Sequence, residues 1–332
     1  MKPELLELLR CPATGSELIV TDAEFKDGEI ETGSLASKAG PQRYPIRGGI
    51  PRFVPASNYA DNFGMQWNRF RATQLDSHSG HPISAQRFWN STGWKPEELD
   101  GRWVLDIGCG AGRFAEVALE AGAHVVALDY SSAVDACYAN LRHHTRLHVV
   151  QGNVYELPLR PGAFPYVYSL GVLQHTPDVA KAFFALPPML APGGQLCVDY
   201  YGKTVRSFLH PKYWLRPITK RLPPARLFSI LEKWVPTLLP ISVKVGSVPL
   251  VGRVLRRCVP VINYVGELPL DDRQQLEWSL LDTFDTYAPA YDNPQTARTA
   301  RRWLEQAGMT DVAVFTAGLL IGRGRKPDRT RS

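Results

Sequence analysis

The sequence predicts an α/β protein with a doubly wound, mostly parallel seven-stranded sheet of Rossmann-like type. Three observations predict this fold. An apolar run over 103–107 leads into three closely spaced glycines and then a helical stripe, which is the strand–turn–helix frame of a nucleotide-binding loop. Strands and helices then alternate as far as residue 201, as they do around a parallel sheet. A last helix is followed by two apolar segments, 312–315 and 319–322, that read as an antiparallel hairpin.

The chain divides into five expected segments. They are a small β-rich unit over 1–56, an N-terminal helical lid over 57–100, a cofactor-binding core over 101–201, a helical basic and apolar lid insertion with the substrate region over 202–293, and the last helix and hairpin of the core over 294–325. Apolar residues make up 44% and charged residues 21% of the 332, as in ordinary globular proteins. The five cysteines are scattered, and the N-terminus lacks a secretion-signal pattern. We therefore expect a cytoplasmic protein without disulfides or a cysteine-built metal site.

The glycine spacing and a downstream acid suggest the ligand. Glycines stand at 108, 110 and 112, whereas a dinucleotide-binding loop would have glycine at 113, where this chain has Arg113. Asp129 ends the predicted second strand, 21 residues after Gly108, near the offset at which an acid meets ribose hydroxyls. Asn153, after the third strand, can accept a hydrogen bond from an adenine amino group through its carbonyl.

These motifs, together with 171–178 after the fourth strand and 191–199 as a loop and fifth strand, resemble class I S-adenosylmethionine-dependent methyltransferases of the methyltransferase-11/25 type. The resemblance implies S-adenosyl-L-methionine as cofactor, S-adenosyl-L-homocysteine as product and no metal. The cofactor-binding residues that it implies are Asp106, Gly108, Gly110, Gly112, Asp129, Tyr130, Asn153, Val154 and Leu170, with Tyr59, Gln66 and Trp67 from the N-terminal lid. An aromatic helix face that only caps the core is the alternative for the lid residues.

The first fifty residues carry a second resemblance. The pattern L-x-x-L-x-C-P, followed by Y-P-I-x-x-G-I-P, resembles a small zinc-ribbon family whose members activate tRNA and protein methyltransferases. Thr14 stands at the usual second cysteine position and no later cysteine pair follows. Cys11 alone cannot hold a structural zinc, which needs four ligands. We expect a degenerate, metal-free unit that serves packing.

The strand ends at the carboxyl edge of the sheet supply the candidate catalytic groups. Methyl transfer to a hydroxyl needs a base, whereas an amine or an acidic phenol can react through positioning alone. His175 follows the fourth strand and is the expected base; packing against the cofactor or capping of the next helix is the alternative. Asp199, Tyr200 and Tyr201, at the end of the fifth strand, are rival candidates. The polar and aromatic stretch 281–296 adds Asp282, Asp285 and Tyr287 as substrate contacts, unless it is only a capped loop.

The positive charge of the chain lies in the insertion. Residues 203–265 contain twelve Lys or Arg against one acid, Glu232, so their net charge is +11 while the whole chain carries +6. A lid over the pocket, a lid that also contacts membrane peripherally through 203–257 (with Phe208 and Trp214 among its aromatics), and a nucleic-acid surface are all open, in that order of preference. We expect O-methylation of a small-molecule, glycan or lipid-linked acceptor. RNA or protein methylation is one alternative, and a non-catalytic cofactor-binding scaffold is another. The oligomeric state is not predicted.

Overall fold

The computed structural model describes residues 1–55, 58–203 and 211–328, and Phe208, one of the aromatics expected at the membrane contact, lies outside these ranges. The main sheet has seven strands in the order β10-β11-β9-β8-β5-β6-β7. Their bounds are β5 Trp103–Ile107, β6 His124–Asp129, β7 Leu147–Gln151, β8 Phe164–Ser169, β9 Leu190–Tyr200, β10 Thr310–Ala317 and β11 Leu319–Arg325. Strands β5 to β9 pair in parallel, and β11 pairs antiparallel with both β9 and β10. The predicted fold class is therefore confirmed.

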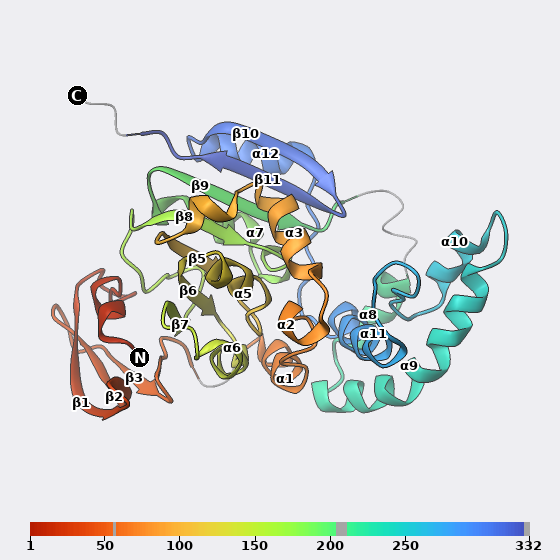
Figure 1. Cartoon of the computed structure of the whole chain (residues 1–332), viewed down its shortest axis with the longest axis horizontal. Helices are drawn as coiled ribbons and strands as arrows, with labels where there is room; N and C mark the ends of the chain where they lie inside the picture. Colours follow the sequence, from red (N-terminus) through yellow and green to blue (C-terminus); the bar gives the residue numbers. More distant parts are fainter. Residues whose placement is uncertain (56–57, 204–210, 329–332) are drawn as a thin grey trace.

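Helices cover both faces of this sheet (Figure 1). On one face α3 (Ile83–Thr92), α5 (Arg113–Glu120) and α6 (Ala133–Leu141) bury Phe88, Phe114 and Val134 in one cluster with the strands. On the other face α7 (Val179–Phe184) and α12 (Ala297–Gln306) bury Phe183 and Trp303. Short helices α2 (Asp76–Ser79) and α4 (Pro96–Leu99) and the 3-10 turns η2 (Leu173–His175) and η3 (Pro187–Met189) complete the core.

The N-terminal unit is a four-stranded antiparallel sheet packed against the second face of the core (Figure 1). A 3-10 turn, η1 (Pro3–Glu7), precedes β1 (Leu18–Lys26), β2 (Glu29–Ser37), β3 (Arg43–Arg47) and β4 (Ile50–Pro51). Its apolar side chains belong to the same buried cluster as those of β6, β7 and α7. Backbone bonds join the two units in both directions, from Arg10 N to Pro158 O at 2.9 Å and from Arg160 N to Leu8 O at 2.7 Å.

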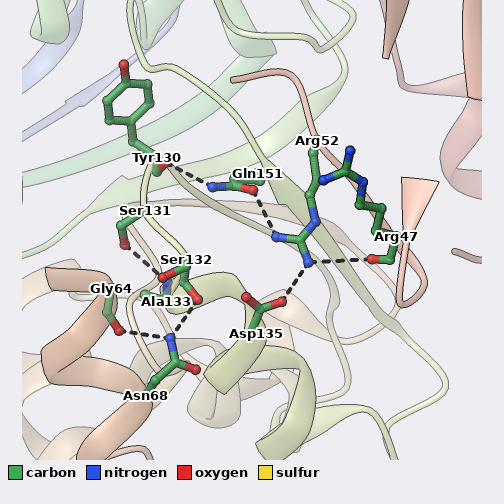
Figure 2. Close-up of polar contacts among 10 residues, drawn as sticks. All are labelled: Arg47, Arg52, Gly64, Asn68, Tyr130, Ser131, Ser132, Ala133, Asp135 and Gln151. Atoms are coloured by element: carbon green, nitrogen blue, oxygen red, sulfur yellow. Dashed lines mark hydrogen bonds and ion pairs between the residues drawn. The ribbon is translucent and has the colours of Figure 1, made fainter. Parts of the chain in front are cut away.

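One arginine ties this unit to the first face of the core as well (Figure 2). Arg52 donates to Gln151 Oε1 at 2.9 Å and to Asp135 Oδ1, on α6, at 2.6 Å. Gln151 in turn donates to the carbonyl of Tyr130 at 3.3 Å. The contact network of the small unit therefore reaches the loop that follows β6.

The insertion forms a helical lobe beside the core, at the right in Figure 1. It contains α8 (Pro211–Thr219), α9 (Pro224–Gly246), α10 (Gly252–Leu255), η5 (Arg256–Cys258) and α11 (Asp272–Tyr287). Helix α9 packs on α11 and on Phe70, which follows α1 (Asp61–Arg69), through a third apolar cluster. The capped-loop alternative does not hold for the start of 281–296, because residues 281–287 are the end of α11. A capping box starts that helix: Asp271 accepts from Gln274 N at 2.8 Å, and Gln274 accepts from Asp271 N at 3.1 Å.

Candidate active site

A cavity of about 810 Å³ lies at the carboxyl ends of β5, β6, β8 and β9. Strand order changes direction between β5 and β8, so the cavity occupies the switch point at which open α/β sheets bind ligands. Side chains from α1, α8 and α11 close its other side. Its volume is in the range of small-molecule and cofactor pockets.

The glycine loop forms one wall because larger residues would not fit there. Gly108 has φ +82°, and a Cβ on it would lie 2.4 Å from a methyl of Val172. Gly110 has φ +53°, and its Cβ would lie 3.2 Å from the indole of Trp67. Both positions combine a left-handed backbone with a close neighbour, which only glycine tolerates. The loop backbone therefore borders the cavity directly.

Asp129 lies beside this loop at the end of β6. Its Oδ2 accepts from Gly110 N at 3.0 Å, and its Oδ1 accepts from Ser131 N at 2.8 Å and from Ser131 Oγ at 2.7 Å. Burial raises the pKa of Asp129, although these bonds oppose the rise. A carboxylate has about four acceptor sites, so this one retains acceptor capacity toward a diol. Tyr130 and Tyr59, with ring centroids 5.1 Å apart, line the cavity next to it. These groups fit the ribose and base of a nucleoside.

His175 is among the residues that line the cavity. Its Nδ1 lies 3.1 Å from the carbonyl oxygen of Tyr291, which can only accept, so Nδ1 carries the proton and Nε2 carries a lone pair. Nε2 is buried and has no hydrogen-bond partner among the described residues. The ring lies between Phe63 and Tyr201, at centroid distances of 5.4 and 5.3 Å. Asp178, rather than His175, caps α7, by accepting from Lys181 N at 2.9 Å.

A connected set of polar groups lies across the cavity from the glycine loop. Arg113 donates to Gln74 Oε1 at 2.5 Å, and Gln74 donates to Asp282 Oδ1 at 3.2 Å. Tyr264 donates to Asp282 Oδ2 at 2.5 Å. Burial raises the pKa of Asp282 to about 6, partly opposed by the bond from Tyr264. A cavity-lining acid with a perturbed pKa is a candidate functional group.

The structure places most of the predicted contacts at the cavity. Those that line it are Tyr59, Trp67, Gly108, Gly110, Asp129, Tyr130, Val154, Leu170, His175, Tyr201, Asp282 and Asp285. The spacing of α11 explains the last two, since Asp282, Asp285 and Thr286 recur at helical intervals and share a face.

The predictions of Tyr200 and Tyr287 as substrate contacts are wrong. Tyr200 is fully buried on the opposite side of β9 from Tyr201, with its ring 6.1 Å from that of Trp303, because successive strand residues point to opposite faces. Tyr287 lies in the apolar cluster between α11 and α9. Both oxygens of Asp199 already accept hydrogen bonds, from Gly171 N at 2.5 Å and from Arg87 at 2.8 Å. Asp199 is therefore a positioning residue for Arg87 and for the backbone at Gly171.

Four predicted cofactor contacts are not among the residues that line the cavity. Gly112 faces α6, where a Cβ would lie 2.6 Å from Leu141. The side-chain carbonyl of Asn153 accepts from Tyr155 N at 3.0 Å, forming a local turn. Asp106 is 2% exposed and burial raises its pKa to about 8. Gln66 is 1% exposed, and its amide atoms have no partner within the described parts of the chain.

Several cavity residues carried no recognisable signal in the sequence. Arg87, Gln74, Tyr264 and Trp278 come from four separate segments, and none belongs to a motif. The capping box at 271–274 could have identified α11 as a helix, and with it the face that carries Asp282. Arg113 was noted only as a departure from the dinucleotide spacing, yet it lines the cavity.

The surroundings of Cys11 and Thr14, where a zinc ribbon would hold its metal, do not fit a metal ion. Thr14, at the second ligand position, shares a hydrogen bond with Ser16 Oγ at 2.9 Å and another with Ser37 Oγ at 3.3 Å. The thiol of Cys11 lies 3.4 Å from the Tyr44 hydroxyl. One thiol among neutral hydroxyls lacks the thiolate and imidazole ligands that structural zinc requires.

Counted from β5 as the first strand, the sheet order is 3-2-1-4-5-7-6. With the glycine loop and Asp129 at the switch point, this order defines a nucleoside-binding domain of Rossmann-like type. Residues 105–198 match the family model described as methyltransferase domain, and residues 2–49 match the one described as Trm112p-like protein. The chain thus carries a class I S-adenosylmethionine-dependent methyltransferase domain behind a degenerate Trm112p-like unit.

Similar proteins differ in their acceptors. The chain is 34% identical over 116 residues to a ubiquinone biosynthesis O-methyltransferase of Marinobacter nauticus, covering 33% of this chain and 49% of that protein. It is 32% identical over 134 residues to a tRNA U34 carboxymethyltransferase of Klebsiella pneumoniae, and the match covers 37% of this chain and 40% of that protein. The chain spans about half the length of the first of these curated relatives. A solved structure of human N-acetylserotonin methyltransferase aligns with 82% of this chain and 60% of its own, at 13% identity and a TM-score of 0.46.

Proposed function

We propose that this protein transfers the methyl group of S-adenosylmethionine to a hydroxyl of a small-molecule, glycan or lipid-linked acceptor. The observation that carries the proposal is His175 in the cavity lining, with its Nδ1 proton directed to the Tyr291 carbonyl and its Nε2 without a partner among the described residues. When bound, the cofactor would supply an activated methyl group. Nε2 of His175 would accept the proton that the acceptor hydroxyl loses as it takes up that methyl group.

The residues around His175 support this role as base. The Tyr291 carbonyl holds the Nδ1 proton and stabilises the imidazolium that forms when Nε2 accepts a second proton. Phe63 and Tyr201 limit rotation of the ring. Such a base contributes roughly 10²–10⁴ in rate, whereas positioning of the two reactants contributes up to about 7–11 kcal/mol. Asp129 and the glycine loop would hold the nucleoside, so cofactor binding does not depend on His175.

The polar wall opposite the glycine loop supports a hydroxylated acceptor. Asp282 and Asp285 offer acceptors to hydroxyl groups, and Arg87 offers guanidinium donors beyond the one that it gives to Asp199. The ubiquinone O-methyltransferase relatives, by name, fit the same reaction type.

The surface of the insertion favours a lipid-linked acceptor met at a membrane surface. Exposed apolar side chains lie along α8 and α9 and in the turn before α10. They include Trp214 at 71%, Ile218 at 66%, Trp234 at 58% and Leu250 at 103% exposure. Exposed Lys and Arg side chains flank them, namely Lys220, Arg221, Arg226, Lys233, Lys244 and Arg257. Apolar residues interleaved with bases suit the interface of an anionic membrane, where each base adds about 1 kcal/mol. Among the described helices, none is long and apolar enough to cross a membrane.

RNA methylation is the second candidate, because the same bases suit a phosphate backbone and one relative is named for tRNA. Vesicle flotation and tRNA binding at two salt concentrations separate the two. Salt-sensitive binding to tRNA, without binding to vesicles of phosphatidylglycerol and phosphatidylcholine, would put RNA first.

The reaction itself is tested with His175→Gln, which keeps a polar side chain but cannot take up the proton. We expect kcat for a hydroxyl acceptor to fall by roughly 10²–10⁴, while calorimetry gives an unchanged dissociation constant for S-adenosylmethionine. His78→Gln, at an exposed histidine of α2, is the matched control. An undiminished rate for His175→Gln at every pH would refute the base role. Cofactor binding without consumption in a broad acceptor screen would favour a scaffold.

A further inference from the structure

Two histidines and a glutamate meet at the seam between the Trm112p-like unit and the methyltransferase domain. His124 begins β6, His148 lies in β7, and Glu4 lies in η1 of the small unit. His148 is paired with Val126 in the sheet, so it shares a face with His124, two residues earlier. One ligand atom from each of the three residues lies within 4.8 Å of the other two. His148 Nε2 and Glu4 Oε1 are 3.3 Å apart.

His148 is buried and His124 is half-buried, and both have ring nitrogens without a partner among the described residues. His148 is 3% exposed, and neither of its ring nitrogens has a hydrogen-bond partner in the described part of the chain. The same holds for His124 Nδ1. The ring of Trp103 lies 5.0 Å from His124 and 5.1 Å from His148 and restrains both. A buried polar atom without a partner costs about 1–3 kcal/mol, which a bound ligand would offset.

Two positive groups, Lys2 and the N-terminal ammonium, also act electrostatically on His148. Both are paired within the small unit and with β7: Lys2 donates to Leu147 O at 2.9 Å and lies 3.8 Å from Glu29, and the N-terminal ammonium donates to Ile30 O at 2.6 Å.

We propose that Glu4, His124 and His148 bind one divalent transition-metal ion that joins the Trm112p-like unit to the methyltransferase domain. Two imidazoles and one carboxylate suit Zn²⁺, with water as the fourth ligand. Metal–ligand distances of about 2.0–2.2 Å require the three atoms to draw together. The Glu4 side chain, 54% exposed, is free to make that movement. This site is separate from the ribbon position at Cys11 and Thr14 and from the cavity, so the inference does not depend on the proposed reaction.

The test uses the full untagged chain in a Cys258→Ser background, because Cys258 is an exposed thiol. After removal of metal with EDTA, Zn²⁺ is titrated in competition with a chromophoric chelator. We expect one Zn²⁺ per chain with a dissociation constant at or below about 1 μM. Glu4→Gln and His124→Gln should each weaken binding by roughly tenfold or more. His143→Gln, at an exposed histidine nearby, should leave it unchanged.

A second readout measures the structural role. Zn²⁺ should raise the urea midpoint of unfolding of the parent chain, because a ligand that binds only the folded state stabilises it. The rise should be smaller in Glu4→Gln, a variant whose change lies at the surface and leaves the two imidazoles in place. Absence of 1:1 binding to the parent chain, or equal affinity in Glu4→Gln, His124→Gln and the parent, would overturn the proposal.

Discussion

Replacement of Asp282 by Asn should stabilise the protein at neutral and higher pH and cost it activity. Burial raises the pKa of this carboxyl from 3.8 to about 6. The folded state therefore binds more protons than the unfolded state between about pH 4 and 6, and the stability of the parent protein falls as pH rises through that window. A shift of about two units corresponds to at most about 3 kcal/mol above pH 6. Asn removes this penalty, but Gln74 and Tyr264 donate to different oxygens of Asp282, and one of these becomes an NH2 group that cannot accept. Loss of that bond costs about 1 kcal/mol. The net gain is about 2 kcal/mol.

Urea unfolding followed by tryptophan fluorescence, from about pH 5 to about pH 8, measures this difference. The advantage of Asp282→Asn should grow with pH and level off above about pH 6. Asp272→Asn, at an exposed carboxylate that starts the same helix, is the control. A variant less stable than the parent at pH 8, or an advantage that shrinks as pH rises, would refute the reasoning. Acceptor turnover should fall in the same variant while cofactor affinity holds.

Three further predictions concern other parts of the molecule. Asp129→Asn should weaken S-adenosylmethionine binding by roughly 10–100-fold in calorimetry, because hydrogen bonds to a charged acceptor are worth about 1.5–3 kcal/mol; an unchanged constant would remove Asp129 from the cofactor site. Arg52→Met should lower the free energy of unfolding by about 1–2 kcal/mol, through the bonds it loses to Gln151 and Asp135, whereas Arg47→Met, at an exposed side chain, should not. Leu250→Asp should reduce flotation with anionic vesicles by roughly tenfold, and flotation equal to that of the parent would contradict the membrane contact.

The flotation experiment has a matched control within the chain. Phe25, on β1 of the small unit, is 63% exposed, so Phe25→Asp removes another exposed apolar group far along the sequence from the insertion. If both variants lose flotation equally, general surface hydrophobicity rather than the insertion is responsible.

The fold could be predicted from the sequence because its signals are local. An apolar strand, a glycine turn and an amphipathic helix each occupy a few consecutive residues, and β5, Gly108 and α5 follow that order. The glycine-loop side of the cavity could be predicted for the same reason, since Gly110 and Asp129 lie at fixed places relative to strand ends. The errors at Tyr200 and Tyr287 concern which face of an element a residue occupies, and a shift of one residue reverses that choice on a strand.

The side of the cavity that we propose for the acceptor could not be predicted, because its polar residues come from separate segments of the sequence. Arg113 reaches Asp282 through Gln74, so one hydrogen-bonded chain unites the helix after the glycine loop, the segment before α2, and α11. Each of these residues is individually unremarkable in sequence, and only packing of the insertion onto the core brings them together.

Apolar packing and one arginine hold the Trm112p-like unit against the core. Hydroxyl groups lie around Cys11, and the shared apolar cluster and Arg52 join the unit to the methyltransferase domain. Because Arg52 reaches Gln151, and Gln151 holds the carbonyl of Tyr130 beside the cavity (Figure 2), loosening of this seam would disturb the cofactor end of the site before the acceptor end. Arg52→Met should accordingly raise the cofactor dissociation constant more than it changes turnover at saturating cofactor.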